Sequence, residues 1–290
     1  MNKRLSILAL ILCSFFWGTS GVLTQIALKD ISPMNLIFFR FFIAAIIGLL
    51  FMKSIKLDFN HLKQGLALSG LLMVIYISST LGLKYTTASN AGFIIGSAVV
   101  LVPIFDYLMY KTKFTKIEII SILICFIGLF FVTFNSTFNF NKGDFYCFID
   151  ACAYATYILY NGKKTKELNT KTLVTIQYTL VSIFTLAYTI STKTFTMPSS
   201  LNIWLVLIIL GIFCTFLAFY LQLLAQKNLS PHYSSRLLTL IPIFSVLFDM
   251  IYLHELISLS VFLGGTLVIL STILDEINFF KPKAQKIYSK

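Results

Sequence analysis

The sequence predicts an all-α membrane protein with ten transmembrane helices in two inverted five-helix repeats, and three observations support this prediction. Of the 290 residues, 58% are hydrophobic and only 12% are charged, whereas soluble domains carry about 25% charged residues. The apolar residues form ten runs, most of them near the ~20 residues that a helix needs to cross a bilayer. The basic residues gather in alternate loops. This composition excludes a soluble globule with a single core.

The ten runs give the boundaries of the expected spans. The first run is too long for a signal peptide and is followed directly by a second one. The expected spans cover approximately residues 5–28, 33–52, 64–83, 88–110, 117–134, 144–161, 172–190, 201–225, 232–253 and 258–275. Five cysteines lie in or near these runs without a CxxC pair, so we expect reduced core residues and no metal site.

Charge placement predicts the orientation and argues against nucleic acid as a partner. The net charge is +12, but the charges form short clusters between apolar runs instead of a basic face with interleaved aromatic residues. With the N-terminus in the cytoplasm, 17 of the 23 Lys and Arg residues fall in loops on its side and 4 on the other. We therefore expect a multi-pass protein of the cell membrane with both termini cytoplasmic and basic loops that contact lipid.

The two halves of the chain correspond to each other. Trp17 and Arg40 recur as Tyr154 and Gln177 at an offset of 137 residues, and the proline of the fourth span, Pro103, recurs at an offset of 139. Each half holds five spans, an odd number, so the second half enters the membrane in the opposite sense. The expected units are residues 5–134, residues 143–275 and a basic cytoplasmic tail at 276–290. Inverted repeats of this kind are typical of secondary transporters.

Several short motifs, in their order and spacing, resemble one family. The segments that carry the resemblance are 17–20 (WGTS), 32–33 (SP), 39–41 (FRF), 83–92 (LKYTTASNAG), 229–231 (LSP) and 254–256 (HEL). Together they resemble an EamA-type transporter of the drug/metabolite transporter (DMT) superfamily over residues 5–275. The resemblance implies a central cavity lined mainly by helices 1, 3, 4, 6, 8 and 9, and the movement of small metabolites, often amino acids and often outward. The sequence departs from the family where Lys111 and Lys113 stand in place of the acidic residue that closes the second repeat as Glu255.

The stretch 88–110 suits a helix that lines a cavity. It begins with small residues, which allow close approach of another helix or a ligand, and it contains a proline, which removes a backbone donor and bends the helix. We expect helix kinks at Pro103 and Pro242. The candidate substrate-binding residues are Trp17, Asn90, Gly92, Gly96, Ser97, Tyr154 and Tyr157. A packed interior helix with an ordinary kink and packing aromatics is the alternative.

Charged residues inside the spans need partners or water, because a charge at the centre of a span costs about 2.5–3.5 kcal/mol. The candidate structural or coupling charges are Arg40, Asp106, Asp150, Asp249 and Glu255. From their expected depths, Arg40 pairs with Asp150 or Asp249. For Asp106 the nearest expected bases are Lys111 and Lys113, and His232 is expected at the surface of the cytoplasmic mouth.

Two classes of function remain. The first is a secondary transporter that moves a small metabolite, an amino acid or a related compound, by alternating access and in the direction of export, with an uptake permease of the same fold as the alternative. Protons are the candidate coupling ion, no cofactor is expected, and the chain is a monomer or a homodimer. The second class is a non-transporting membrane scaffold or an intramembrane enzyme. The sequence contains no HExxH, GxSxG or paired-acid motif, so we expect no enzyme.

Overall fold

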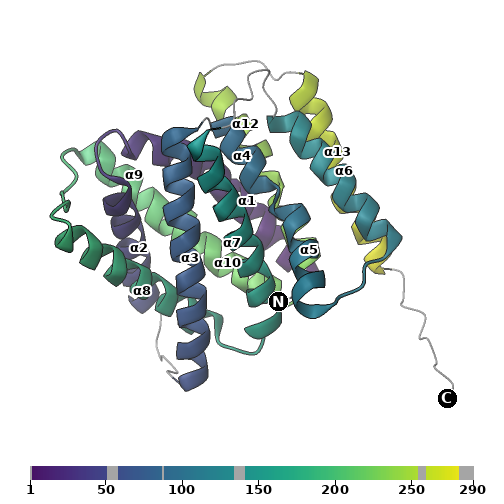
Figure 1. Cartoon of the computed structure of the whole chain (residues 1–290), viewed down its shortest axis with the longest axis horizontal. Coiled ribbons are helices and arrows are strands. Elements are labelled where there is room, and N and C mark those ends of the chain that lie inside the picture. Colours follow the sequence, from purple (N-terminus) through teal and green to yellow (C-terminus); the bar gives the residue numbers. More distant parts are fainter. Residues whose placement is uncertain (1, 51–57, 87, 134–140, 254–258, 281–290) are drawn as a thin grey trace.

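The structure is a computed structural model that describes residues 2–50, 58–86, 88–133, 141–253 and 259–280. Its described segments form a bundle of helices (Figure 1). The helices of the N-terminal half are α1 (Lys3–Ala27), α2 (Pro33–Leu50), α3 (Phe59–Tyr85), α4 (Ala88–Gly96), α5 (Ala98–Tyr110) and α6 (Lys116–Thr133). The helices of the C-terminal half are α7 (Lys142–Lys164), α8 (Thr170–Ser191), α9 (Leu201–Gly211), the π-helix η1 (Ile212–Leu217), α10 (Ala218–Gln226), α11 (Pro231–Leu238), α12 (Leu240–Leu253) and α13 (Leu259–Phe280).

Six stretches of helix are long and apolar enough to cross a membrane. They are Lys3–Ala27, Pro33–Leu50, Phe59–Tyr85, Ala91–Tyr110, Thr170–Ser191 and Leu201–Gln226. A shorter apolar stretch, Leu259–Ser271, lies in α13. Helix α7 is 23 residues long, but it carries charged residues near both ends and much of it is buried in the protein. The protein is therefore a multi-pass membrane protein, and the crossing of the membrane by all ten predicted spans stays a prediction.

Polar side chains begin most of the helices. Asn2, Asp58, Asn169 and Ser230 each accept a hydrogen bond from a backbone N–H in the first turn of the helix that follows. Such caps satisfy donors that the first helical turn leaves unpaired. At the start of α7, Asn141 forms a capping box with the residue three positions later. The loops thus define where each helix starts.

Contacts between loop residues and the ends of helices define two ends of the bundle. At the end that holds the chain's start, which we call the N-terminal end, Asn228 donates to Ser6 Oγ over 3.2 Å and the N–H of Asn169 donates to His61 Nε2 over 3.0 Å. At the opposite end, Asn35 donates to the carbonyl oxygen of Thr194 over 2.8 Å. Successive long helices therefore run in alternating directions between these two ends.

The helices of the two halves interlock. Helix α3 packs against α7 and α8, α1 packs against α10 and α12, and α2 packs against α8. Helices α6 and α13 pack mainly against each other and stand at one side of the bundle (Figure 1). The largest buried cluster draws residues from both halves, including Leu10, Phe41, Leu72, Tyr157 and Phe219. Neither half could form this core without the other.

Three expected spans are not continuous α-helices. The expected span 88–110 is divided at Ser97 into α4 and α5, and the span 232–253 is divided at Thr239 into α11 and α12. At each break the hydroxyl donates to the carbonyl oxygen three residues earlier, Ser97 to Ile94 over 2.6 Å and Thr239 to Arg236 over 2.5 Å. The third span contains η1 between α9 and α10.

Candidate functional site

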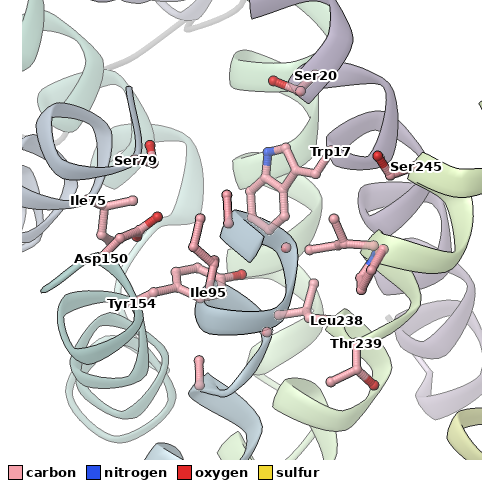
Figure 2. Close-up of a pocket in the computed structure, with 18 of the residues that line it drawn as sticks. Trp17, Ser20, Ile75, Ser79, Ile95, Asp150, Tyr154, Leu238, Thr239 and Ser245 are labelled. Atoms are coloured by element: carbon pink, nitrogen blue, oxygen red, sulfur yellow. The ribbon is translucent and has the colours of Figure 1, made fainter. Parts of the chain in front are cut away.

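A cavity of about 300 Å³ lies among the helices of both halves (Figure 2). Its walls come mainly from α1, α3, α4, α5, α7, α10, α11 and α12. These helices belong to the first, third, fourth, sixth, eighth and ninth expected spans, which are the spans that the family resemblance implies. The cavity extends toward the opposite end of the bundle, since Thr24 and Leu83 line it from the last turns of α1 and α3. A volume of this size suits a small molecule, because ligand pockets hold about 300–1,000 Å³.

Aromatic side chains form a large part of the wall. The Trp17 ring lies edge-on to Tyr154 and to Phe219, with centroid distances of 5.9 and 4.8 Å. The indole N–H of Trp17 donates to the carbonyl oxygen of Cys214 over 2.9 Å, and the Tyr154 hydroxyl accepts from Gln222 Nε2 over 3.1 Å. Because the polar atoms of Trp17 and Tyr154 are bound to protein, their rings are held in place for contact with an apolar ligand.

The π-helix η1 supplies the acceptors that hold this wall. A π-helix shifts the hydrogen-bond register by one residue, and such turns occur frequently at functional sites. Here the Cys214 carbonyl oxygen accepts from Trp17, and the carbonyl oxygens of Thr215 and Phe216 accept from the Tyr178 hydroxyl over 3.2 and 3.0 Å. The hydroxyl of Thr215 donates in turn to the carbonyl oxygen of Leu210 over 2.8 Å. Nothing in the sequence between Ile212 and Leu217 marks this turn.

Arg40 reaches the cavity from α2 and is 2% exposed. Its Nε donates to Thr215 Oγ1 over 2.8 Å, and its Nη2 lies 3.4 Å from both Ser20 Oγ and the Cys214 carbonyl oxygen. The guanidinium also lies over the Tyr76 ring, 4.6 Å from the centroid. Within the described part of the chain, no carboxylate forms an ion pair with Arg40.

The expected partners of Arg40 take other places. Asp150 lines the cavity from α7 and is 2% exposed, but it forms no ion pair with Arg40. The side chain of Asp249 and the whole of Glu255 lie outside the described residues. Arg40 is therefore stabilised by hydroxyl groups, a backbone carbonyl and an aromatic ring, and its pairing with Asp249 stays a prediction.

The small residues of α4 and of the break that follows it take different places. Gly92 and Gly96 line the cavity. A Cβ at Gly96 would nevertheless lie 2.8 Å from Leu129 Cδ2, so this face of Gly96 is the contact with α6 and a larger side chain there would strike protein. Ser97 is not among the lining residues, and its hydroxyl bonds to its own helix. The side chain of Asn90 lies outside the described residues.

Two further candidates lie near the cavity without facing it. Tyr157 is fully buried beside Tyr154 and donates to Gln177 Oε1 over 2.9 Å. Pro103 is buried within α5, six residues beyond the helix break at Ser97, whereas Pro242 lines the cavity from α12, three residues beyond the break at Thr239. The interruptions of these helices are thus found at hydroxyl residues that precede the prolines.

Asp106 belongs to a different cluster, at the N-terminal end. Its carboxylate binds Lys163 Nζ, and its other oxygen lies 2.6 Å from His232 Nε2. Lys163 also donates to Thr112 Oγ1 over 3.2 Å. The expectation that loop lysines next to Asp106 in the sequence would pair with it is wrong, and His232 is buried at 7% exposure instead of at the surface. The reason is that α7 ends and α11 begins beside α5, which a single sequence does not reveal.

The family resemblance implied that the third helix lines the cavity, but sequence reasoning named none of its residues. Tyr76, Ser79 and Thr80 all line the cavity. They lie in a long apolar run, and only their polar atoms at i, i+3 and i+4 spacing could have indicated one shared helix face. The described residues hold no group of three His, Cys, Asp or Glu that could bind a metal ion.

Comparison with known proteins identifies the family. The profile of the EamA-like transporter family matches residues 4–134 and again residues 141–274. An uncharacterized transporter of Archaeoglobus fulgidus is 31% identical over 267 residues, which cover 92% of this chain and 84% of that protein. The uncharacterized transporter YoaV of Bacillus subtilis is 18% identical, with 95% and 98% covered. A crystal structure with 15% identity superposes with a TM-score of 0.80 over 96% of this chain and 98% of that one, which shows the same fold.

The two matches of the family profile cover nearly the whole chain, and the resemblance seen in the sequence motifs is thereby confirmed. Relatives that share most of their length with this chain carry transporter names. Members of the family are transporters and not enzymes. The chain belongs to the EamA-like transporter family.

Proposed function

We propose that the chain is a secondary transporter that moves a small amphipathic metabolite, an amino acid or a related compound, across the cell membrane by alternating access. The observation that carries this proposal is the cavity, which is lined by both halves and extends to the last turns of α1 and α3. Toward the N-terminal end the cavity is followed by the cluster of Asp106, Lys163 and His232. A central site with one closed side is the arrangement that alternating access requires.

The proposal includes ten membrane crossings in two inverted halves, residues 5–134 and 143–275. The packing pattern supports it, because exchanging each helix for its counterpart five spans away reproduces the neighbours. Under this exchange the contact of α3 with α7 corresponds to the contact of α10 with α1, and the contact of α3 with α8 corresponds to that of α2 with α9. The contact of α6 with α13 corresponds to itself. The two separate matches of the family profile support the same division.

The proposed orientation places both termini in the cytoplasm, so the cavity faces outward. Export is the proposed direction because the family resemblance implies it. The 17-to-4 distribution of loop charges supports the orientation. Single cysteines on a background without native cysteines test it with a membrane-impermeant thiol reagent. A cysteine at Ser199 should react from outside intact cells, and a cysteine at Lys166 only after the membrane is opened. The reverse pattern would overturn the orientation.

Transport is tested with the purified full chain in proteoliposomes. A panel of labelled amino acids and their amines is measured for flux, with and without a pH gradient across the membrane. We expect saturable flux of at least one aromatic or aliphatic compound and a rate that changes with the gradient if protons are the coupling ion. A scaffold would give no flux above empty liposomes for any compound, and flux toward the interior of intact cells would favour the uptake permease.

A further inference from the structure

One carboxyl group in the cavity has no partner among the described residues that would stabilise its negative charge. Asp150 is 2% exposed, and its Oδ1 is buried without a hydrogen bond from any described residue. Its carboxyl group points toward the space between Trp17 and Tyr154 (Figure 2). In the described segments, no Lys, Arg or His forms an ion pair with it. A carboxylate buried in this way is costly unless it is protonated or binds a cation.

The other buried aspartates show what a structural carboxylate looks like in this chain. Asp106 is bound by Lys163 and His232. Asp144 accepts from the N–H of Asn141 over 2.8 Å and from the Thr86 hydroxyl over 2.5 Å. Both groups are buried, and both are satisfied by protein. Asp150 differs from them because its environment leaves a binding position open on the cavity side.

The walls around Asp150 carry few groups that could neutralise it. The titratable residues that interact with it are Tyr76 from α3 and, on its own helix, Cys147 and Tyr154. Arg40 lies over the Tyr76 ring and is bound to Thr215, and it forms no ion pair with Asp150. The cavity residues of α4, α5, α10 and α11 are uncharged. A cation that binds Asp150 in its ionised form therefore has to enter the cavity from outside the protein.

We propose that Asp150 is the cation-binding carboxyl of the cavity and that it binds the protonated amino group of a transported molecule in exchange for one proton. The inference rests on the proposed transport function and adds the chemical class of the ligand. In the exchange, the O–H bond of the Asp150 carboxylic acid breaks and its proton passes to water in the cavity. The ammonium group keeps its hydrogens and donates N–H hydrogen bonds to the resulting carboxylate, so charge and atoms balance.

The rest of the cavity defines the body of this ligand. Trp17, Tyr154 and Phe219 present ring surface in the cavity that Asp150 lines, which suits an apolar or aromatic group attached to the amine. Aromatic faces also attract the ammonium group itself. A cavity of about 300 Å³ holds a compound with one ring. A primary amine and an amino acid both supply the ammonium group, and the test below separates them.

The test uses the purified full-length chain in detergent micelles at pH 7 with a weak buffer and a pH-indicator dye. The probes are 2-phenylethylamine, phenylalanine and 2-phenylethanol, which share a ring and differ in charge. We expect the amine or the amino acid to bind and to release about one proton per bound molecule, because the amino group is already protonated at this pH. The alcohol should release none. If only the amine or only the amino acid binds, that result identifies which class of compound supplies the ammonium group.

Variants of Asp150 test whether the released proton comes from this residue. Asp150→Asn should abolish the proton release and weaken binding of the amine at least about tenfold, while Asp150→Glu should retain the release. Asp58→Asn removes a carboxylate from the exposed cap of α3 and is the matched control that should leave both readouts unchanged. Unchanged amine affinity in Asp150→Asn, or an unchanged release, would overturn the inference, as would the absence of amine and amino acid binding by folded wild-type chain.

A second measurement on the wild-type chain covers the case in which Asp150→Asn does not fold. Because proton and ammonium compete for one carboxyl, amine affinity should fall as the pH is lowered from 8 to 5, a range in which the amine stays charged. An affinity that is independent of pH would contradict the exchange. Flux in liposomes separates this inference from the transport proposal. Binding without any flux would contradict transport alone, and flux of the amine that persists unchanged in Asp150→Asn would contradict the role of Asp150 alone.

Discussion

Asp106 Oδ2 lies 2.6 Å from His232 Nε2, and this contact joins α5 of the first half to α11 of the second. Lys163 adds a third helix, α7, through the other oxygen of the same carboxylate. The Phe114 ring stands edge-on to His232 with a centroid distance of 5.0 Å. One buried carboxylate of α5 thus joins α7 and α11 at the N-terminal end of the bundle.

Removing this carboxylate should destabilise the bundle. Asp106→Asn leaves a buried His232 and a cationic Lys163 with weaker acceptors, so we expect the free energy of unfolding to fall by about 2–3 kcal/mol. The Lys163 side chain keeps 26% exposure, and water therefore replaces part of its lost interaction. Unfolding in mixed micelles measures the change. Lys166→Gln, in the exposed loop beyond α7, is the control and should change stability little; equal stability of both variants would contradict the prediction.

Filling the cavity at Gly21 should stop transport without harming the fold. Gly21 lines the cavity, and a Cβ placed there would meet no atom within 4 Å. Gly21→Leu should therefore occupy ligand space and lower flux in proteoliposomes at least about tenfold, with unchanged thermal stability in detergent. Gly70 on α3 is exposed and also has no atom within 4 Å of such a Cβ. Gly70→Leu is thus the matched control, and similar flux in both variants would mean that the substrate passes elsewhere.

The Arg40 environment predicts coupling with Thr215. Arg40→Met removes the Nε donor, and Thr215→Val removes its acceptor over a distance of 2.8 Å. Each single change leaves a buried group of the other residue without its partner. The loss in free energy of unfolding in the double variant should therefore be smaller than the sum of the two single losses, by about 1–3 kcal/mol. Unfolding of the four chains gives this coupling energy. The pair Arg40→Met and Thr266→Val, with Thr266 on the exposed face of α13, should be additive.

The close crossing of α6 and α13 should tolerate no additional atom. A Cβ at Gly264 would lie 2.5 Å from the Gly128 carbonyl oxygen and 2.7 Å from the N atom of Val132. Because backbone atoms cannot move aside, Gly264→Ala should destabilise the chain by about 1–3 kcal/mol. At the neighbouring Gly265, the nearest atom is Ile243 Cδ1 at 3.8 Å. Gly265→Ala should instead be neutral or stabilising, since alanine favours a helix by about 1 kcal/mol over glycine; a reversed order would show that the helices separate easily.

Much of the fold follows from the sequence because long apolar runs have few alternatives in a bilayer. Helices such as α1, α2 and α8 begin and end close to the expected boundaries. The cap at Asp58 starts α3 earlier than its apolar run does, since polar residues continue the helix beyond its hydrophobic part. The breaks at Ser97 and Thr239 and the π-turn η1 depend on contacts with other helices, and local residue preferences do not determine them.

Residues of the candidate site could be predicted where the side chain is unusually small or aromatic. Trp17, Gly92, Gly96 and Tyr154 all line the cavity. The charge partners were not predictable in the same way, because pairing depends on which helix ends meet. Depth alone placed Arg40 beside Asp150, but the carbonyl that η1 releases and the Thr215 hydroxyl occupy the guanidinium instead.

The glycine contact between α6 and α13 also limits the routes by which a molecule could reach the cavity. Gly128 and Gly264 bring the two backbones together, each with the other's carbonyl oxygen within 2.8 Å of the position of a Cβ. No acyl chain fits into such a seam. A hydrophobic compound that dissolves first in the bilayer therefore cannot pass sideways between these two helices. Its entrance has to lie at another helix boundary or at the water-facing mouth.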